Sequence, residues 1–567
     1  MPQGHQSTPI HDVVIIGTGA GGGTVTQVLV QLGLKVTILE AGPMLNPARD
    51  YKEHMWPYAL DHRGAGPDGA AYFGGGSNYF GAHAGGYQIP GEPYTAAPGS
   101  QFRWFRSRIT GGRTNHFGRI FFRCSDYDFK PYSNDGLGTD WPISYEDLSP
   151  YYDKAESFIG VAGTTEGLRS APDGIFQEPP PPRVHEALIQ GSCRNLGIPC
   201  IPARMAVLTK PHNGRAPCHY CGQCSRGCVT AANYSSSQVQ IFPAMETGRV
   251  TLINDAMARE LITDDSGAIT AVSYVDKVTR AEKQIRCRSV VLAASAAESA
   301  RLLLNSKSSQ HENGLANSSG TVGRFLTDSI ATSVRAYVPA LDGMPIHNTD
   351  GTAAYHMYAP WWELSKPNKD FPRGYHIEIR GGYDMPRVGA FNDLCRRNQG
   401  YGQSLKDAIK KDYGTWISLN GRGEMIPNAD SFCEIDTNSV DQWGIPTLRF
   451  HFKHSEHEFK MVEHMQQHFT AILEGTGGTV EPDSRPTADK ISTGGSVTHE
   501  TGTVRMGDDP ATSALNKYCQ SHEVRNLFVA DAGPFVSHPE KNPTLTICAL
   551  AWRTAEYLAE EMRKGNV

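Results

Sequence analysis

The chain has 567 residues, which is too long for one compact hydrophobic core and predicts at least two domains. Its 53 basic and 59 acidic residues give a net charge of −6 with no basic block, which argues against nucleic acid as a partner. No run of about 18 apolar residues is present, so we expect no direct membrane span. The polar first ten residues predict no signal peptide of its own.

The first predicted element is an apolar strand that leads into the pattern Gly-x-Gly-x-x-Gly, at Gly17, Gly19 and Gly22. A helix follows, and then a second strand over residues 36–39 that ends at Glu40. Glycines at this spacing let a pyrophosphate approach the free N–H groups at the start of the helix. An acidic residue at the position of Glu40 accepts hydrogen bonds from a ribose 2′-OH and repels a 2′-phosphate. The pattern predicts a dinucleotide site for FAD or NAD rather than NADP; a plain glycine-rich turn is the alternative.

The next predicted features are two loops. Residues 50–95 are aromatic, glycine-rich and without clear periodicity, which favours a long loop or lid over the cofactor. Gly111 and Gly112 allow the backbone to approach a flat ring closely, and the polar Asn115 and His116 after them are placed to line it. A plain turn would explain the same residues.

Four of the twelve cysteines fall within eleven residues and have the spacing Cys-x2-Cys-x2-Cys-x3-Cys. This spacing is typical of loops that wrap thiolates around an iron–sulfur cluster. Three or four of the thiolates could be ligands, so a 3Fe-4S and a 4Fe-4S cluster are both open. A tetrahedral zinc site and two disulfides are the competing interpretations. The four residues are Cys218, Cys221, Cys224 and Cys228.

The middle of the chain contains predicted helices and strands of two kinds. Ser144 precedes an acidic first turn and predicts a capped helix that runs towards Phe158. Residues 250–253 and 269–275 have the composition of strands in a small antiparallel sheet, and 289–295 predicts a buried strand before a helix over about 298–304.

From residue 331 onwards the pattern changes to short alternating strands with one helix near 456–473. A last helix is expected over 543–561, where the chain rejoins the first domain. These patterns predict a dinucleotide-binding domain, a connecting region and a sheet-rich domain, with the boundaries 10–120, 240–330 and 490–567 for the first, 121–239 for the second and 331–489 for the third.

Four blocks in the chain together resemble the glucose–methanol–choline (GMC) oxidoreductase family. They are the glycine loop with Glu40, the Gly111–Gly112 segment, the block at 293–294, and the C-terminal segments 531–533 and 542–546. The resemblance implies an α/β fold: a Rossmann-like FAD-binding domain with a second, antiparallel-sheet substrate-binding domain. The cysteine cluster is similar to that of the catalytic subunits of bacterial FAD-dependent sugar dehydrogenases, of the glucose and glucoside 3-dehydrogenase type. Those subunits work with a small escort subunit and a cytochrome.

The resemblance also implies roles for individual residues. It assigns the glycine loop to the pyrophosphate, Glu40 to the ribose, Met257 to the adenine through its backbone, and Asp531 to the ribityl or pyrophosphate part of FAD. A covalent bond between His116 and the flavin is left open. The remaining residues expected around the cofactor are Gly111, Gly112, Asn115, Ala532 and Thr544.

The family's catalytic pair corresponds here to His499 and Asn542. An alcohol loses a hydride to flavin N5 only if its hydroxyl proton also leaves, and a neutral imidazole is suited to accept that proton. Asn542 would hold the same oxygen by a hydrogen bond. A structural histidine is the alternative for His499.

The sequence thus predicts an FAD-dependent dehydrogenase that oxidises a hydroxyl of a sugar or glycoside, at C1 or C3, and passes electrons through an iron–sulfur cluster to a cytochrome. An oxidase that uses dioxygen, or a non-catalytic flavin or zinc-bound interaction subunit, is the alternative. A partner carrying an export signal would take the folded chain to the periplasm; otherwise it stays in the cytoplasm.

The cysteine loop should be partly exposed so that an electron-accepting partner can dock there. The residues expected to contact that partner are His219, Tyr220, Gln223 and Arg226. The rings of Trp361 and Trp362 could stack on a bound sugar, although adjacent aromatic residues more often lie in a core.

Overall fold

The computed structural model describes residues 10–55, 59, 86–344, 351–352, 354–364, 370–382, 394–395, 397–482 and 487–567. Most of the predicted lid over residues 50–95, namely 56–58 and 60–85, lies outside the described residues. No helix in the described part of the chain is long and apolar enough to cross a membrane.

The first layer of the fold is a seven-stranded sheet with the order β5-β2-β1-β8-β7-β6, in which β16 also pairs with β8. Strands β1, β2, β5, β8 and β16 pair in parallel, and Val13–Ile16 of β1 are buried, as expected of a strand covered on both faces. The strands are β1 (Ile10–Ile16), β2 (Val36–Leu39), β5 (Val250–Ile253), β6 (Ala256–Thr263), β7 (Ile269–Asp276), β8 (Glu282–Leu292) and β16 (Leu527–Val529).

One detail of this sheet differs from the prediction. Residues 250–253 form no part of a small antiparallel sheet, because β5 lies at the parallel edge, where Val250 pairs with Val36 of β2. A run of four residues carries no signal for its pairing partner. By contrast, β7 does pair antiparallel with β6 and with the first half of the long strand β8, while the last three residues of β8 pair in parallel with β16.

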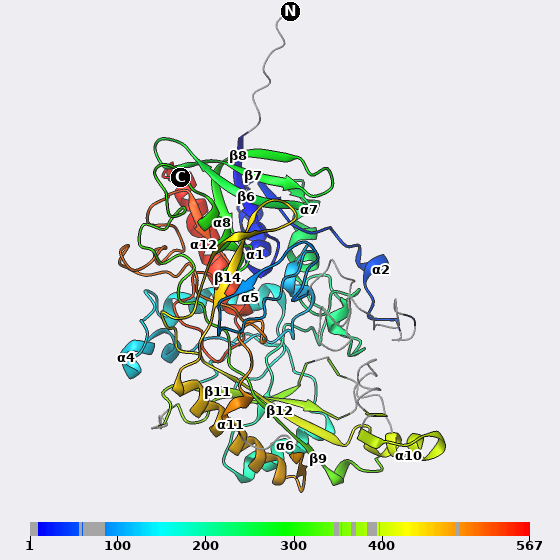
Figure 1. Cartoon of the computed structure of the whole chain (residues 1–567). Helices are drawn as coiled ribbons and strands as arrows, with labels where there is room; N and C mark the ends of the chain where they lie inside the picture. Colours follow the sequence, from blue (N-terminus) through cyan, green and yellow to red (C-terminus); the bar gives the residue numbers. More distant parts are fainter. Residues whose placement is uncertain are drawn as a thin grey trace, which may run out of the picture.

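Helices α1 (Ala20–Gln31) and α12 (Thr544–Lys564), from opposite ends of the chain, pack against each other beside this sheet (Figure 1). The remaining α-helices are α2 (Pro47–Asp50), α4 (Pro131–Asp135), α5 (Tyr145–Ile159), α6 (Val184–Asn195), α7 (Phe242–Glu246), α8 (Ala296–Asn305), α10 (Gly402–Asp412) and α11 (Glu456–Glu474). Short 3-10 helices are η3 (Gly112–Asn115), η4 (Asp126–Phe129), η5 (Cys224–Arg226), η7 (Pro339–Leu341) and η9 (Ala488–Lys490), and η6 (Ser237–Ile241) is a π-helix.

The second layer is a six-stranded sheet with the order β15-β9-β12-β11-β10-β4, at the other end of the molecule in Figure 1. It is antiparallel throughout, and β12 alternates buried and half-buried residues because α11 covers one of its faces. Its strands are β4 (Ile201–Pro202), β9 (Ser333–Tyr337), β10 (Met357–Ala359), β11 (Tyr375–Gly381), β12 (Trp416–Gly423) and β15 (Thr479–Val480).

A third, three-stranded sheet combines β13 (Phe432–Val440) and β14 (Pro446–His451) with β3 (Thr95–Ala96). This hairpin packs on α8, next to the first sheet, although its residues fall in the range predicted for the substrate domain. The predicted fold class, a Rossmann-like sheet with a second antiparallel sheet, is confirmed. The predicted domain boundaries stay predictions.

Candidate active site

A cavity of about 520 Å³ lies among the residues that the sequence singled out. Segments from both main sheets line it, so the cavity spans the junction between the two layers of the fold. Its lining includes these predicted site residues: Gly17, Gly19, Glu40, Gly112, His116, Cys224, Met257, His499, Asp531, Ala532, Asn542 and Thr544. Gly22, Gly111 and Asn115 are not in the lining.

The glycine loop between β1 and α1 forms one end of the cavity. Gly17 has φ +101°, and a Cβ there would lie 2.4 Å from the carbonyl oxygen of Ala293, so only glycine fits. A Cβ on Gly22 would lie 2.0 Å from the carbonyl oxygen of Gly17, which shows that this glycine allows the helix to pack on the loop. Gly19 is different, because a Cβ there would meet no protein atom within 4 Å. Gly19 therefore leaves open space at the start of α1, where a pyrophosphate would approach the helix N–H groups.

Glu40 is buried at the end of β2 and is held by the same loop. The backbone N–H groups of Thr18 and Gly42 donate to its carboxylate at 3.2 and 2.9 Å, and the Thr18 hydroxyl also donates to it. Burial raises the pKa of Glu40, while these hydrogen bonds act in the opposite direction. The carboxylate lines the cavity and retains lone pairs for a ribose hydroxyl.

Asp531 follows β16 and also lines the cavity. Its carboxylate accepts hydrogen bonds from the N–H of Ser295 at 3.1 Å and from the N–H of Gly533 at 2.7 Å. Ser295 has φ 94°, a strained backbone for a residue with a side chain, so the conformation that makes this contact costs free energy of folding. Burial raises the pKa of Asp531 to about 6.

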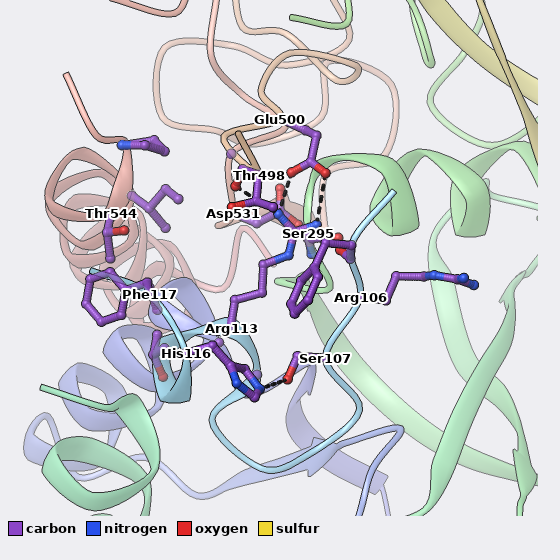
Figure 2. A pocket seen from close by; sticks show the side chains of 18 of the residues that line it. Arg106, Ser107, Arg113, His116, Phe117, Ser295, Thr498, Glu500, Asp531 and Thr544 are labelled. Atoms are coloured by element: carbon purple, nitrogen blue, oxygen red, sulfur yellow. Dashed lines mark hydrogen bonds and ion pairs between the residues drawn. The ribbon is translucent and has the colours of Figure 1, made fainter. Parts of the chain in front are cut away.

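Residues of the Gly111–His116 segment also line the cavity. Its start is fixed because the N–H of Gly111 donates to the Thr18 hydroxyl at 2.8 Å. Asn115 turns away from the cavity: its amide donates to the carbonyls of Thr110 and Gly112, and Tyr51 donates to it. His116 faces the cavity with Nε2 3.0 Å from the Ser107 hydroxyl (Figure 2). Asn115 therefore shapes this segment, and the predicted cofactor contacts of the segment stay predictions.

Sequence reasoning missed an ion pair that ties this segment to the C-terminal region. Figure 2 shows Arg113 reaching from the segment to Glu500, next to the predicted catalytic histidine. The Arg113 guanidinium also donates to the carbonyl of Thr498 at 3.1 Å. No motif links Arg113 with Glu500 in the sequence, since 387 positions separate them.

His499 and Asn542 come together in the same cavity, 3.3 Å apart between Nε2 of the ring and Nδ2 of the amide. The carboxylate of Asp328 fixes the backbone of His499 by accepting its N–H at 2.8 Å. Burial lowers the pKa of His499 well below its usual value, so the ring is neutral at pH 7. Oδ1 of Asn542 is buried and has no hydrogen-bond partner in the described part of the chain. A neutral base and an amide with a free acceptor atom thus share one small space.

Polar groups of the second sheet line the cavity near this pair. Glu378 on β11 pairs with Arg422 on β12 at 2.9 Å, and both lie in the lining together with Tyr355. The Tyr355 hydroxyl is buried, and the described residues provide it with no hydrogen-bond partner. These groups can bind the hydroxyls of a polar substrate.

The four clustered cysteines lie on one loop beside the cavity, and none of them forms a disulfide with another described residue. Cys224 is buried and lines the cavity, whereas Cys218 and Cys221 are half-buried. Burial, with a smaller contribution from neighbouring thiols, raises the pKa of Cys218 to about 12 and of Cys221 to about 11. Within the described ranges, no group of three or more ligand side chains is placed as a bound metal ion would require.

Two groups of residues were predicted to contact other molecules, but most of them are packed inside the protein. Gln223 and Arg226 are buried rather than exposed for docking, because Arg226 donates to the carbonyl of Met55 at 2.9 Å; His219 is exposed, as predicted. Trp361 and Trp362 pack on each other and on Tyr375 and do not line the main cavity. The tryptophan pair is therefore part of the core of the second domain.

A flavin dinucleotide fits the groups that surround the cavity. The open space at Gly19 suits the pyrophosphate, buried Glu40 suits a ribose, and the N-terminus of α12 at Thr544 favours negative charge on a reduced ring. His499 and Asn542 line the same cavity as the glycine loop. The residues present thus match the cofactor that the resemblance implies.

Comparisons with known proteins agree with this architecture. Over 569 residues the chain is 28% identical to 2-methyl-1,2-propanediol dehydrogenase from Mycolicibacterium austroafricanum, with 97% of this chain and 95% of that protein covered. It is 25% identical to the fructose dehydrogenase large subunit from Gluconobacter japonicus, with 98% of each chain covered. A solved structure of formate oxidase from Aspergillus oryzae has the same fold, with a TM-score of 0.64 at 14% identity, covering 98% of this chain and 100% of that chain.

Two family models described as GMC oxidoreductase match residues 13–331 and 427–551, which is most of the chain. The second match contains His499 and Asn542, and the first contains the glycine loop and Glu40. The chain therefore belongs to the GMC oxidoreductase family and is an FAD-dependent oxidoreductase that acts on the CH–OH group of an alcohol.

Proposed function

We propose that this protein is a dehydrogenase that oxidises a hydroxyl of a sugar or glycoside, at C1 or C3, and delivers the electrons to an external acceptor. The observation that carries the proposal is the meeting of His499 and Asn542, 3.3 Å apart, in the same cavity as the glycine loop and Glu40. FAD, when bound, supplies the hydride acceptor for the carbon that is oxidised.

The residues of this chain supply the proton transfer and the orientation. His499 Nε2 would accept the proton of the substrate hydroxyl, because the ring is kept neutral by burial. Asn542 would hold the same oxygen, since its amide lies against the ring. Glu378, Arg422 and Tyr355 provide donors and acceptors for further hydroxyls, which supports a polyhydroxylated substrate rather than an apolar alcohol. The fructose dehydrogenase subunit among the relatives is consistent with such a substrate.

The position of the cysteine loop supports the proposal that electrons leave the cavity on that side. Cys224 lies in the cavity wall, and the same loop reaches solvent at His219. The proposal includes an iron–sulfur cluster bound by Cys218, Cys221, Cys224 and Cys228, and the spacing of these cysteines is its only support. A relative named as a large subunit supports the presence of partner chains, which we propose to be a small escort subunit and a cytochrome c. We further propose that an exported partner carries the protein to the periplasm; without such a partner it would stay in the cytoplasm.

Product identification tests the proposal. The protein with FAD is incubated with a panel of sugars and methyl glycosides and an artificial electron acceptor, and the position of the new carbonyl group is determined by NMR. We expect a keto product at C3 or a lactone from C1. If only simple alcohols are oxidised, the assignment of a sugar substrate is wrong.

Two further measurements test the route of the electrons. The substrate-reduced protein is reoxidised either by air or by a dye, and stoichiometric peroxide formed rapidly in air would make the protein an oxidase. Iron and acid-labile sulfide are assayed in protein prepared without oxygen, and stoichiometric zinc with no sulfide would remove the iron–sulfur cluster.

A further inference from the structure

A single serine hydroxyl connects the predicted catalytic histidine to a second, fully buried histidine. The Ser329 hydroxyl lies 2.9 Å from Nδ1 of His499 and 2.7 Å from Nε2 of His538. Ser329 precedes β9, whereas His538 lies between β16 and α12, so the three residues come from separate segments. Ser329 is 2% exposed and His538 is 0% exposed, which keeps bulk water from replacing either contact.

The single hydroxyl hydrogen of Ser329 couples the protonation patterns of the two histidine rings. A serine hydroxyl has one hydrogen, so it can donate to one ring nitrogen only and must accept a hydrogen bond from the other. One ring therefore presents N–H to Ser329 and the other presents a bare nitrogen. The protonation pattern of His499 is consequently not independent of that of His538.

Asn542 determines the direction in which this chain of hydrogen bonds runs. Its Nδ2 donates towards Nε2 of His499, and a donor there requires Nε2 to be bare. The hydrogen of the neutral ring is then on Nδ1, which donates to Ser329, and Ser329 donates to Nε2 of His538. The bare Nε2 carries the lone pair that a base requires.

The surrounding groups keep both rings neutral. Arg422 on β12, with Glu378 and His376 on β11, lies within electrostatic range of His499, and Asp328 accepts the backbone N–H of that residue. Burial, with a smaller effect of His376, lowers the pKa of His538 to about 3, and burial also lowers the pKa of His499. Because neither ring is charged at neutral pH, the choice between the two neutral tautomers decides whether His499 can act as a base.

We propose that Ser329 and His538 are positioning residues that hold His499 in the tautomer with a bare Nε2. This inference rests on the proposed role of His499 as the proton acceptor. It assigns to Ser329 a function that no sequence motif indicates, and to His538 a role as the acceptor at the end of the hydrogen-bond chain. Neither residue needs to touch the substrate.

Three variants of the FAD-loaded protein separate this role from simple packing. Ser329→Ala removes the hydroxyl and should slow flavin reduction by methyl α-glucoside by about tenfold, because the ring loses the hydrogen bond that selects its tautomer. Ser329→Thr keeps the hydroxyl and should restore the rate to within about threefold. Thr327→Val is the matched control, since it removes a buried hydroxyl of the same segment that bonds only to Thr501 among the described residues. It should leave the pH profile of reduction unchanged.

A measurement without substrate keeps this inference separate from the proposed function. ¹⁵N NMR of protein labelled at histidine, with His499 assigned through His499→Gln, reports which ring nitrogen carries hydrogen. We expect hydrogen on Nδ1 in the parent and a mixture of tautomers in Ser329→Ala. Hydrogen on Nε2 in the parent, or an unchanged tautomer and an unchanged reduction rate in Ser329→Ala, would overturn the inference. If methyl α-glucoside fails to reduce the parent flavin, the assigned substrate is wrong, and the NMR result still decides the tautomer.

Discussion

The side-chain amide of Asn542 and the ring of His499 meet at 3.3 Å, although 43 positions separate the two residues. This contact predicts unequal effects of the two substitutions. His499→Ala should keep FAD bound and slow flavin reduction by at least about 10²-fold, the low end of what a positioned general base contributes. Asn542→Ala should cost less, because the proton acceptor remains. Stopped-flow absorbance measures both rates, and a His499→Ala protein that reduces at the parent's rate would remove this histidine from the proposed role.

The pH profile of flavin reduction should reflect the buried state of His499. Burial lowers the pKa of the ring below its usual 6.5, so the neutral form persists to more acidic pH. The reduction rate should therefore stay constant as the pH falls from 8 through 6.5 and should decline only below that value. Rapid-mixing measurements across this range check the prediction. An inflection at pH 6.5 or above would show that the ring is solvated in the working enzyme.

The ion pair between Arg113 and Glu500 predicts a large change in stability. The Glu500 side chain is 2% exposed, so Arg113→Met leaves a buried carboxylate without its partner, which costs about 3–5 kcal/mol. Arg113→Lys keeps the positive charge and should cost less. The double variant Arg113→Met with Glu500→Gln should recover much of the loss, because no charge is then left unpaired. Urea unfolding of these three variants and of the single variant Glu500→Gln provides the test, and purely additive losses in the double variant would contradict it.

Gly19 and Gly22 should respond differently to alanine, although both belong to the same motif. Gly19 has φ −63° and open space beside it, so Gly19→Ala should fold normally and weaken FAD binding. Gly22→Ala would place a methyl group 2.0 Å from a carbonyl oxygen and should destabilise even the FAD-free protein by about 1–3 kcal/mol. Thermal unfolding of the FAD-free forms, together with FAD titration, distinguishes the two effects. Equal loss of stability in both variants would contradict this assignment.

Local patterns predicted the elements of the fold well. Ser144 does cap a helix, α5, by accepting a hydrogen bond from the N–H of Asp147, and the helices expected near 298–304 and 456–473 appear as α8 and α11. Each of these signals lies within a few residues of the feature that it predicts. The pairing of β5 with β2 was missed, because a partner more than 200 positions away leaves no local mark.

The same distinction applies to the site. His499, Asn542 and Glu40 belong to recognisable segments, and the structure brings all three into one cavity. Ser329 and Arg113 act through contacts to residues that are distant in the sequence, and no motif surrounds either of them. Such residues could be found only after the chain had been folded.

The cavity also has a consequence for how the protein matures. Its glycine loop is synthesised long before β16 and the start of α12, which complete the sheet and the cavity lining. The last three residues of β8 have no partner on one side until β16 has been made. FAD can therefore be fully enclosed only after β16 and α12 have been synthesised, so we expect cofactor loading to follow the synthesis of these two elements.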